Sequence, residues 1–121
     1  MFISAVVGLG MLPDGRLVSG SQDKCIRAWD VANGRSHIFD KHLGEITCLV
    51  VLSNARLASS DTNRTIIIWD LSPNHFGQIL HKGFLEAPAT CMVYAAQQET
   101  LVVGTEAGLT FLPLSTQTEQ G

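Results

Sequence analysis

The chain has 121 residues, 45% of them hydrophobic and 16% charged, which is enough for one domain core or for part of one. Its formal net charge is −3 and no segment gathers Lys and Arg, so the composition argues against nucleic acid as a partner. No apolar run is long enough to cross a bilayer, and the apolar N-terminus lacks the basic flank of a signal peptide, so we expect an intracellular protein, cytoplasmic or nuclear, without a membrane partner.

The first forty residues predict short strands separated by tight turns. Residues 6–12 are apolar and are followed by a Pro-Asp-Gly sequence that suits a hairpin turn. Residues 14–31, DGRLVSGSQDKCIRAWDV, end in a Trp-Asp pair, and an Asn-Gly pair after them can supply the positive φ of a further turn.

The next segment repeats this pattern at a spacing of forty residues. Residues 54–71, NARLASSDTNRTIIIWDL, align with residues 14–31 without a gap. Six of the eighteen aligned pairs are identical, namely Arg16/Arg56, Leu17/Leu57, Ser19/Ser59, Ile26/Ile66, Trp29/Trp69 and Asp30/Asp70. The runs LVVL and TIII are apolar on consecutive residues, which indicates strands covered on both faces. We therefore expect small sheets stacked face to face.

A weaker third copy follows in residues 90–114. Residues 90–95, 100–105 and 108–114 correspond to the three apolar segments of the earlier copies, and Leu112 and Pro113 replace the Trp-Asp pair. Together the copies predict eleven strands, of which four belong to the first unit, four to the second and three to the third.

These repeats resemble the WD40 family of β-propellers, in which a unit of about forty residues forms a four-stranded blade. The resemblance implies an all-β fold, a partial β-propeller of two to three four-stranded antiparallel blades within residues 1–114. Blade 1 would span about 3–40, blade 2 about 41–82, and a degenerate, incomplete blade 3 about 83–114. We expect the polar residues 115–121 to form a disordered tail.

The resemblance also implies a hydrogen-bonded network inside a blade, formed in this family by a histidine, a strand serine or threonine, a turn aspartate and the tryptophan. Such a network fixes strand register and satisfies polar groups that are costly to bury bare. Phe2 stands where the first blade would carry its histidine, and Asn63 stands where the second would carry its aspartate. Carried over by position, the network residues are Ser19, Asp23 and Trp29 in the first blade, and His42, Ser59, Asn63 and Trp69 in the second.

Ser59 and His42 also raise the question of hydrolysis. The propeller interpretation places this pair inside a blade with Trp69 as the third partner, and neither serine of the network lies in a GxSxG turn. The glycine motifs lack the lysine of a phosphate-binding loop. We expect no catalytic residue.

Metal and cofactor sites are not indicated either. The remaining histidines, at 37, 75 and 81, have no carboxylate or thiol at the spacing of metal ligands. Cys25, Cys48 and Cys91 lie far apart and form no CxxC pair, so we expect free thiols in a reducing compartment. We expect neither a metal nor a cofactor.

The resemblance implies a non-catalytic protein–protein interaction scaffold that presents loops to a protein or peptide partner. Each of the loop positions concerned suits a solvated spacer equally well. An alternative is a regulatory propeller segment of a longer multidomain enzyme or of a ubiquitin-ligase substrate receptor, although Ala32 and Ser72 stand where some such receptors carry Arg or Lys. The expected partner-binding residues are Gln22, Lys24, Lys41, Leu43, Glu45, Thr62 and Arg64.

A stack of three blades would leave its two outermost faces exposed. At about 25 cal/mol per Å², two faces of several hundred Å² each would forfeit on the order of 10 to 20 kcal/mol, as much as the net stability of a typical domain. We therefore expect ring completion by missing blades, by self-association or by another chain. A piece of a longer propeller is favoured over a subunit that closes with copies of itself.

Overall fold

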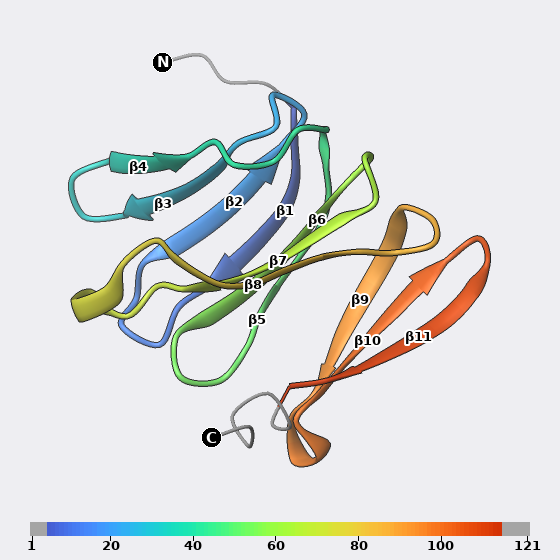
Figure 1. Cartoon of the computed structure of the whole chain (residues 1–121). Coiled ribbons are helices and arrows are strands. Elements are labelled where there is room, and N and C mark those ends of the chain that lie inside the picture. The colour runs from blue at the N-terminus through green and yellow to red at the C-terminus, as the bar shows by residue number, and fades with distance from the viewer. Residues whose placement is uncertain (1–4, 115–121) are drawn as a thin grey trace.

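The computed structural model of the protein describes residues 5–114, and these form three antiparallel sheets (Figure 1). The first sheet contains β1 (Val6–Met11), β2 (Leu17–Ser21), β3 (Ile26–Asp30) and β4 (Arg35–Phe39). The second contains β5 (Ile46–Val51), β6 (Arg56–Asp61), β7 (Thr65–Asp70) and β8 (Gln78–Phe84). The third contains β9 (Ala89–Ala95), β10 (Thr100–Thr105) and β11 (Gly108–Pro113). The all-β fold and the predicted division of eleven strands are confirmed for these residues, and the tail predicted at 115–121 lies outside them.

Each sheet is a meander in which the strands pair in the order of the sequence. The three sheets share one register, because the second and third strands pair Leu17 with Trp29, Leu57 with Trp69 and Leu101 with Leu112. Leu112 therefore occupies the tryptophan position of the third sheet, as the sequence alignment predicted.

The structure contains a β-bulge and two short 3-10 turns that the sequence did not predict. The register shifts between Ile68 and Trp69, where β8 carries an extra residue, and β8 continues until Phe84 pairs with Thr65. The second sheet therefore extends past residue 82, the boundary expected for blade 2. Two 3-10 turns, η1 (Pro73–His75) and η2 (Ala96–Gln98), were not predicted because they are only three residues long.

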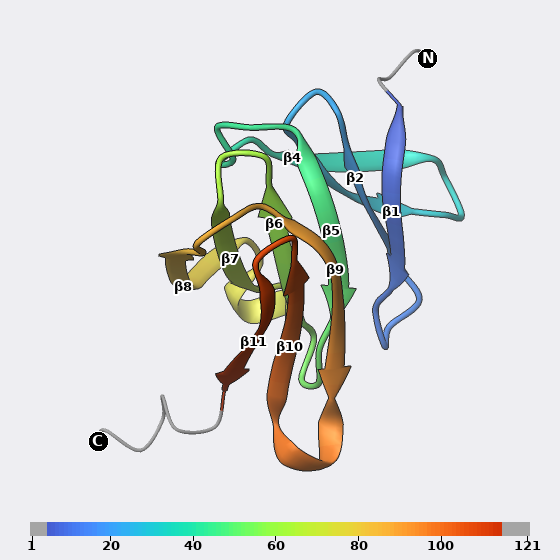
Figure 2. The ribbon, with the colours of Figure 1, turned by 90° about the vertical axis from the view of Figure 1, so that its right-hand side faces the viewer.

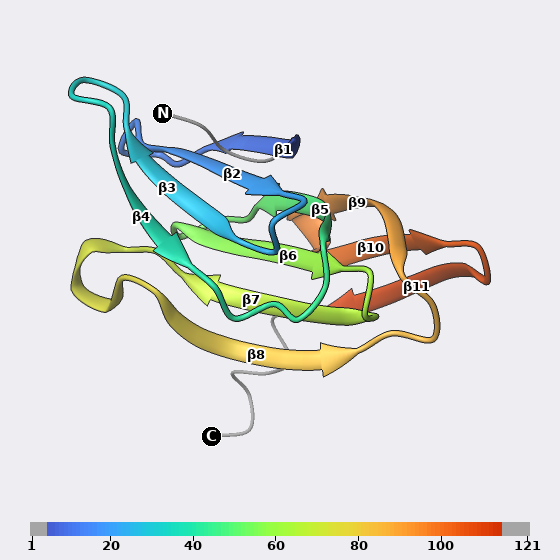
Figure 3. The same ribbon diagram turned by 90° about the horizontal axis from the view of Figure 1, so that it is seen from above.

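Two apolar layers hold the three sheets together. Figure 3 shows β1, β5 and β9 on the same side of the stack. The first layer, between the first and second sheets, consists of Leu12, Val18, Ile26, Ala28, Phe39, Ile46, Leu57, Ile67, Trp69 and Leu71. The second layer, between the second and third sheets, consists of Cys48, Leu52, Ala58, Ile66, Ile68, Leu85, Ala89, Leu101, Val103 and Leu114.

Glycines let the first two sheets approach closely. A Cβ atom on Gly10 would lie 2.7 Å from Cγ2 of Val51, and one on Gly20 would lie 2.6 Å from Cγ2 of Ile46. Real Cβ atoms do not approach other atoms so closely, so any larger residue would push the sheets apart. The described residues include no helix that is both long and apolar enough to span a membrane.

Candidate functional site

A continuous chain of hydrogen bonds runs through the second sheet. His42, in the loop before β5, lies between two residues of β6: its Nδ1 is 2.7 Å from Oδ2 of Asp61 and its Nε2 is 2.6 Å from Oγ of Ser59. Trp69 of β7 donates its indole N–H to the same Ser59 oxygen at 2.8 Å. The side chains of His42 and Asp61 have no exposed surface, and Ser59 is fully buried. This network ties one loop to two strands.

The directions of these hydrogen bonds follow from a neutral histidine. Trp69 donates to Ser59, Ser59 donates to Nε2 of His42, and Nδ1–H of His42 donates to Asp61, so every donor finds an acceptor. Burial lowers the pKa of His42, opposed by Asp61 and assisted by the nearby charge of Lys82.

Asp61 remains ionised in this site. Burial alone would raise its pKa, but hydrogen bonds from His42 and from the backbone N–H groups of Thr65 and Asn63 hold the pKa of Asp61 below its usual range. Those two N–H groups lie 3.0 and 2.8 Å from Oδ1. A neutral imidazole beside a carboxylate therefore holds the network together.

The structure corrects one member of the expected network. His42, Ser59 and Trp69 come together as the resemblance implied, but the Asn63 side chain is exposed and only its backbone N–H reaches the network. Asp61, two residues earlier at the end of β6, takes the carboxylate position instead. A signal for it was present in the sequence, since Asp61 is the carboxylate nearest to Ser59 along the strand and a buried histidine needs a charged or polar partner.

The first sheet carries a shorter version of the network. Trp29 donates to Oγ of Ser19 at 2.9 Å, which matches the pair formed by Trp69 and Ser59. Asp23 is not part of this pair, because within residues 5–114 it bonds to residues other than Trp29 and Ser19. It pairs with Arg27 at 2.9 Å and accepts from Ser21 and from the backbone N–H of Cys25. The hydrogen bond from Arg27, against the opposing effect of burial, lowers the pKa of Asp23 to about 2.

The third sheet has a different polar cluster, shared with the second. Tyr94 and Arg56 both donate to the carboxylate of Glu99, at 2.5 and 3.1 Å, and Oγ of Ser53 lies 2.8 Å from the Tyr94 hydroxyl. The Tyr94 hydrogen bond, followed by that from Arg56, lowers the pKa of Glu99. Sequence reasoning missed this cluster because its two halves, Ser53 with Arg56 and Tyr94 with Glu99, lie 41 to 43 residues apart and belong to no recurring motif.

A serine, a histidine and an aspartate joined in this order also form the catalytic triad of hydrolases. The burial of the residues in the second sheet distinguishes a structural network from such a triad. In this site Ser59 already accepts the Trp69 N–H, and Ser59, His42 and Asp61 are all buried. A nucleophile must be reachable by substrate. The geometry therefore suits fastening strands rather than attacking a substrate.

The seven residues expected to bind a partner lie in connections at one end of the sheets, in the upper part of Figure 1. Gln22 and Lys24 belong to the β2–β3 turn, and the β4–β5 connection carries Leu43, which is 71% exposed. In the second sheet, a backbone hydrogen bond joins the β4–β5 connection to the β6–β7 turn. The Thr62 N–H donates to the Glu45 carbonyl at 2.9 Å. All seven are exposed, namely Gln22, Lys24, Lys41, Leu43, Glu45, Thr62 and Arg64.

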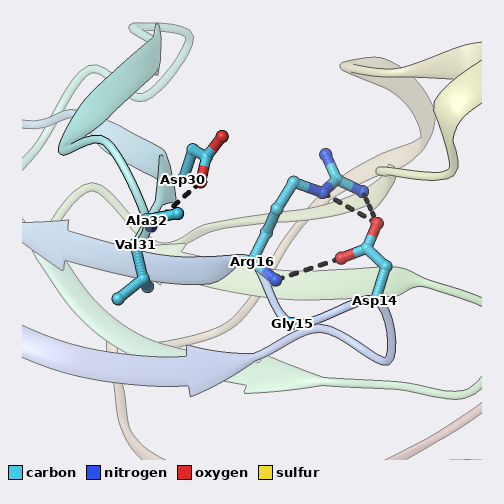
Figure 4. Close-up of a pocket in the computed structure, with 6 residues that line it drawn as sticks. All are labelled: Asp14, Gly15, Arg16, Asp30, Val31 and Ala32. Atoms are coloured by element: carbon cyan, nitrogen blue, oxygen red, sulfur yellow. Dashed lines mark hydrogen bonds and ion pairs between the residues drawn. The ribbon is translucent and has the colours of Figure 1, made fainter.

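A pocket of about 400 Å³ lies at the opposite end of the first sheet (Figure 4). Arg16 lies beside it, paired with Asp14 at 2.7 Å and donating to the Leu71 carbonyl at 2.6 Å. Asp30 accepts from the backbone N–H of Ala32 at 3.0 Å. The polar side chains that line this pocket therefore bond to other groups of the protein. The sequence analysis did not predict this pocket. Within residues 5–114, no cluster of three or more His, Cys, Asp or Glu side chains could hold a metal ion.

Curated relatives share the repeat over part of their length. Ribosome biogenesis protein YTM1 of Saccharomyces cerevisiae is 34% identical over 53 residues, which cover 44% of this chain and 12% of that protein. WD repeat-containing protein pop2 of Schizosaccharomyces pombe is 43% identical over 77 residues, covering 50% of this chain and 11% of that protein. The chain thus spans about an eighth of the length of these relatives.

Solved structures share the fold. The structure of U3-55K superposes with a TM-score of 0.82 at 19% identity, over 96% of this chain and 38% of that one. The crystal structure of RRP9 WD40 repeats gives a TM-score of 0.82 at 19% identity, over 96% of this chain and 37% of that one. The three sheets are therefore arranged as blades of a β-propeller.

The family model described as "WD domain, G-beta repeat" matches residues 3–30 and 34–70, more than half of the chain. These two matches end at Asp30 and Asp70, the last residues of β3 and β7, so the family repeat coincides with the Trp-Asp pairs. On this evidence the chain belongs to the WD40 repeat family, and each of its sheets is one propeller blade.

Proposed function

We propose that the protein is a non-catalytic interaction module that binds a protein or peptide at the blade end formed by its β2–β3, β4–β5 and β6–β7 connections. One observation carries the proposal. Lys24 and Arg64 stand at the same position of two turns forty residues apart, both with positive φ, 74° and 66°, and both exposed. The repeat thus presents a cation twice, from rigid turns, on one end of the stack.

The neighbouring residues complete a surface of mixed character. Lys41 and the exposed Leu43 lie in the loop between the two blades. Neither Lys24 nor Lys41 forms an ion pair with another of the described residues, so their charges are available to a partner. A peptide that carries carboxylates around one apolar side chain would complement this end.

The absence of catalysis in this proposal rests on the buried network. Ser59 and His42 are the pair that invites a hydrolase interpretation, and both are buried, with Ser59 bonded to Trp69. The likeness to YTM1, named as a ribosome biogenesis protein, supports an intracellular location and favours the nucleus over the cytoplasm. Imaging of a fluorescent fusion tests the location.

Charge reversal tests the binding surface. Lys41→Glu and Arg64→Glu should each reduce capture of partner proteins by the purified chain, and the double variant should abolish it, because like charges then face the partner's carboxylates. Arg35→Glu is the matched control, since Arg35 is also exposed but belongs to the β3–β4 hairpin at the opposite end. Unchanged capture by the double variant, with circular dichroism like that of the wild type, would overturn the proposal.

A further inference from the structure

Two of the segments assigned to partner binding lie against each other in blade 2. The β4–β5 connection, residues 40–45, carries Lys41 and Leu43, and the β6–β7 turn, residues 62–64, carries Arg64. The two segments lie side by side in the upper part of Figure 2. Their contact therefore determines how Leu43 is placed relative to Arg64.

Two hydrogen bonds join the connection to the turn directly. The Thr62 N–H donates to the Glu45 carbonyl at 2.9 Å, and the Glu45 N–H donates to Oγ1 of Thr62 at 3.2 Å. Forty residues earlier, blade 1 has the matching backbone bond, from the Gln22 N–H to the Ala5 carbonyl at 3.0 Å. Glutamine has no hydroxyl group, and this backbone bond is the only one between Gln22 and Ala5 within residues 5–114. The bond to the threonine hydroxyl therefore distinguishes the blade 2 part of the site.

Gly44 brings the two backbones into close contact. A Cβ atom at this position would lie 2.9 Å from the backbone nitrogen of Asn63 and 3.2 Å from that of Thr62. A packed backbone cannot move aside as the end of a flexible side chain can. Any larger residue at position 44 must therefore push the connection away from the turn and lengthen the bond from the Thr62 N–H.

A buried carboxylate anchors both segments. Asp61 accepts from Nδ1–H of His42, in the connection, at 2.7 Å and from the backbone N–H of Asn63, in the turn, at 2.8 Å. Gly44 is buried as well, whereas Leu43 is 71% exposed. The connection is thus fixed on both sides of Leu43, by His42 before it and by Gly44 after it. A substitution of Gly44 releases only the second of these two points.

We propose that Gly44 is a positioning residue of the partner site, because its contact with the β6–β7 turn fixes Leu43 relative to Arg64 in the arrangement that a bound peptide contacts. The inference rests on the proposed function and adds that the blade 2 part of the site is formed before the peptide binds. A preformed site has less freedom to lose on binding, and the gain appears mainly as slower dissociation.

Binding kinetics with a defined probe test this role. The probe is a short fluorescein-labelled peptide whose central leucine is flanked by glutamates, followed by stopped-flow fluorescence. Gly44→Ala should raise the dissociation rate constant about tenfold and change the association rate constant less than about twofold, because the charges of Lys41 and Arg64 are unaltered. Gly83→Ala is the matched control, since a Cβ atom there would lie 3.4 Å from its nearest neighbour, the side chain of His81.

Amide hydrogen exchange in the free chain tests the positioning without any peptide. Gly44→Ala should speed the exchange of the Thr62 and Glu45 N–H groups at least about tenfold, because both bonds across the contact weaken. The indole N–H of Trp69 should keep its protection, since the buried network is anchored independently of Gly44.

Thr62→Val repeats the test should Gly44→Ala misfold, and circular dichroism checks each fold. This variant keeps the shape of the side chain and removes only the acceptor of the Glu45 N–H. Exchange of that N–H and dissociation of the peptide should both become faster. Faster exchange in the free chain separates this effect from a direct contact between Thr62 and the peptide.

The outcomes separate this inference from the proposed function. Binding that Lys41→Glu and Arg64→Glu abolish but that Gly44→Ala leaves unchanged would overturn the positioning role alone. A reduced binding amplitude with an unchanged dissociation rate constant would also overturn it, because loss of folded protein has that signature. A wild-type chain that does not bind the peptide would contradict the proposed function and the role of Gly44 together.

Discussion

Blades 1 and 2 carry the same repeat, yet their tryptophans have different surroundings. Both donate to a strand serine, at 2.9 Å from Trp29 and 2.8 Å from Trp69. Trp69 is nevertheless 1% exposed beneath blade 1, whereas Trp29 is half-buried on an open side. The repeat therefore determines strand register and the serine hydrogen bond, and the neighbouring blade determines whether the tryptophan belongs to a core.

One position records this difference in the sequence. Ile67 in blade 2 is fully buried in the first apolar layer, and the residue forty positions earlier is Arg27. Arg27 keeps its charge by pairing with Asp23 beside Trp29. An arginine is compatible with a half-wet or paired environment but not with the layer around Ile67, where its charge would lack a partner.

The largest difference is expected from the tryptophans themselves. Trp69→Ala should lower the free energy of unfolding by about 3 to 5 kcal/mol, because it opens a cavity in the first apolar layer. Trp29→Ala, measured by urea denaturation at the same protein concentration, should cost about 1 to 2 kcal/mol, because less of its surface is covered. Equal losses would show that the two tryptophans are equally important and that the comparison is wrong.

The carboxylate of blade 2 gives the next effect. Asp61→Ala should cost about 2 to 4 kcal/mol, because it leaves the His42 N–H and two backbone N–H groups buried without an acceptor. Asn63→Ala should stay within about 0.5 kcal/mol, since that side chain is exposed. Thermal unfolding of the two variants decides between these positions, and a larger loss for Asn63→Ala would restore the assignment made from sequence.

Acid should weaken blade 2 through His42. Its pKa is lowered by burial, so the unfolded chain binds this proton more readily than the folded one, and stability is constant above pH of about 6.5. Below that value stability should fall by at most about 1.4 kcal/mol per pH unit until the folded histidine titrates. Asp61, whose pKa is lowered too, should add a further loss below pH of about 4.

Urea midpoints measured from pH 8 to pH 5 follow this effect. The variant His42→Gln should be less stable at pH 8 but should lose most of the slope between pH 6.5 and pH 5. His81→Gln provides the control, because His81 is exposed on β8. A slope unchanged in His42→Gln would mean that another group controls the acid response.

The smallest effect is expected from the ion pair of blade 1. Arg27→Ala should cost about 0.5 to 1 kcal/mol, because the pair with Asp23 is partly open to solvent. Its clearer signature is the titration of Asp23 followed by NMR. The midpoint should rise from about 2 toward 3.8 when the arginine hydrogen bond is removed. An unshifted midpoint would assign the low pKa to Ser21 and to the Cys25 N–H instead.

Much of this fold follows from local sequence signals. The spacing of forty residues places Leu17 and Leu57 opposite their tryptophans, and the weaker third copy places Leu101 opposite Leu112 although the tryptophan itself is lost. Register is predictable here because the aligned copies carry the same residues at the same positions, so a pairing that suits Leu17 and Trp29 also suits Leu57 and Trp69.

The site was less predictable because it depends on contacts between distant segments. Asp61 and Asn63 are two residues apart. Only the turn geometry at the end of β6 decides that the Asp61 carboxylate, and not the Asn63 side chain, reaches His42. The cluster of Arg56, Tyr94 and Glu99 joins two blades and depends on how they stack. Motifs within one repeat carry no information about such stacking.

The glycines of blade 1 have a consequence for the geometry of a complete circle. They allow β1 to lie close against β5, while aromatic side chains, with Phe39 5.3 Å from Trp69, fill the space farther out. The interface between blades 1 and 2 is therefore narrow at their first strands and wider at their outer strands. The angle between neighbouring blades determines how many units complete a full turn, so Gly8, Gly10 and Gly20, which have no side chains, help to set the circumference of the whole assembly.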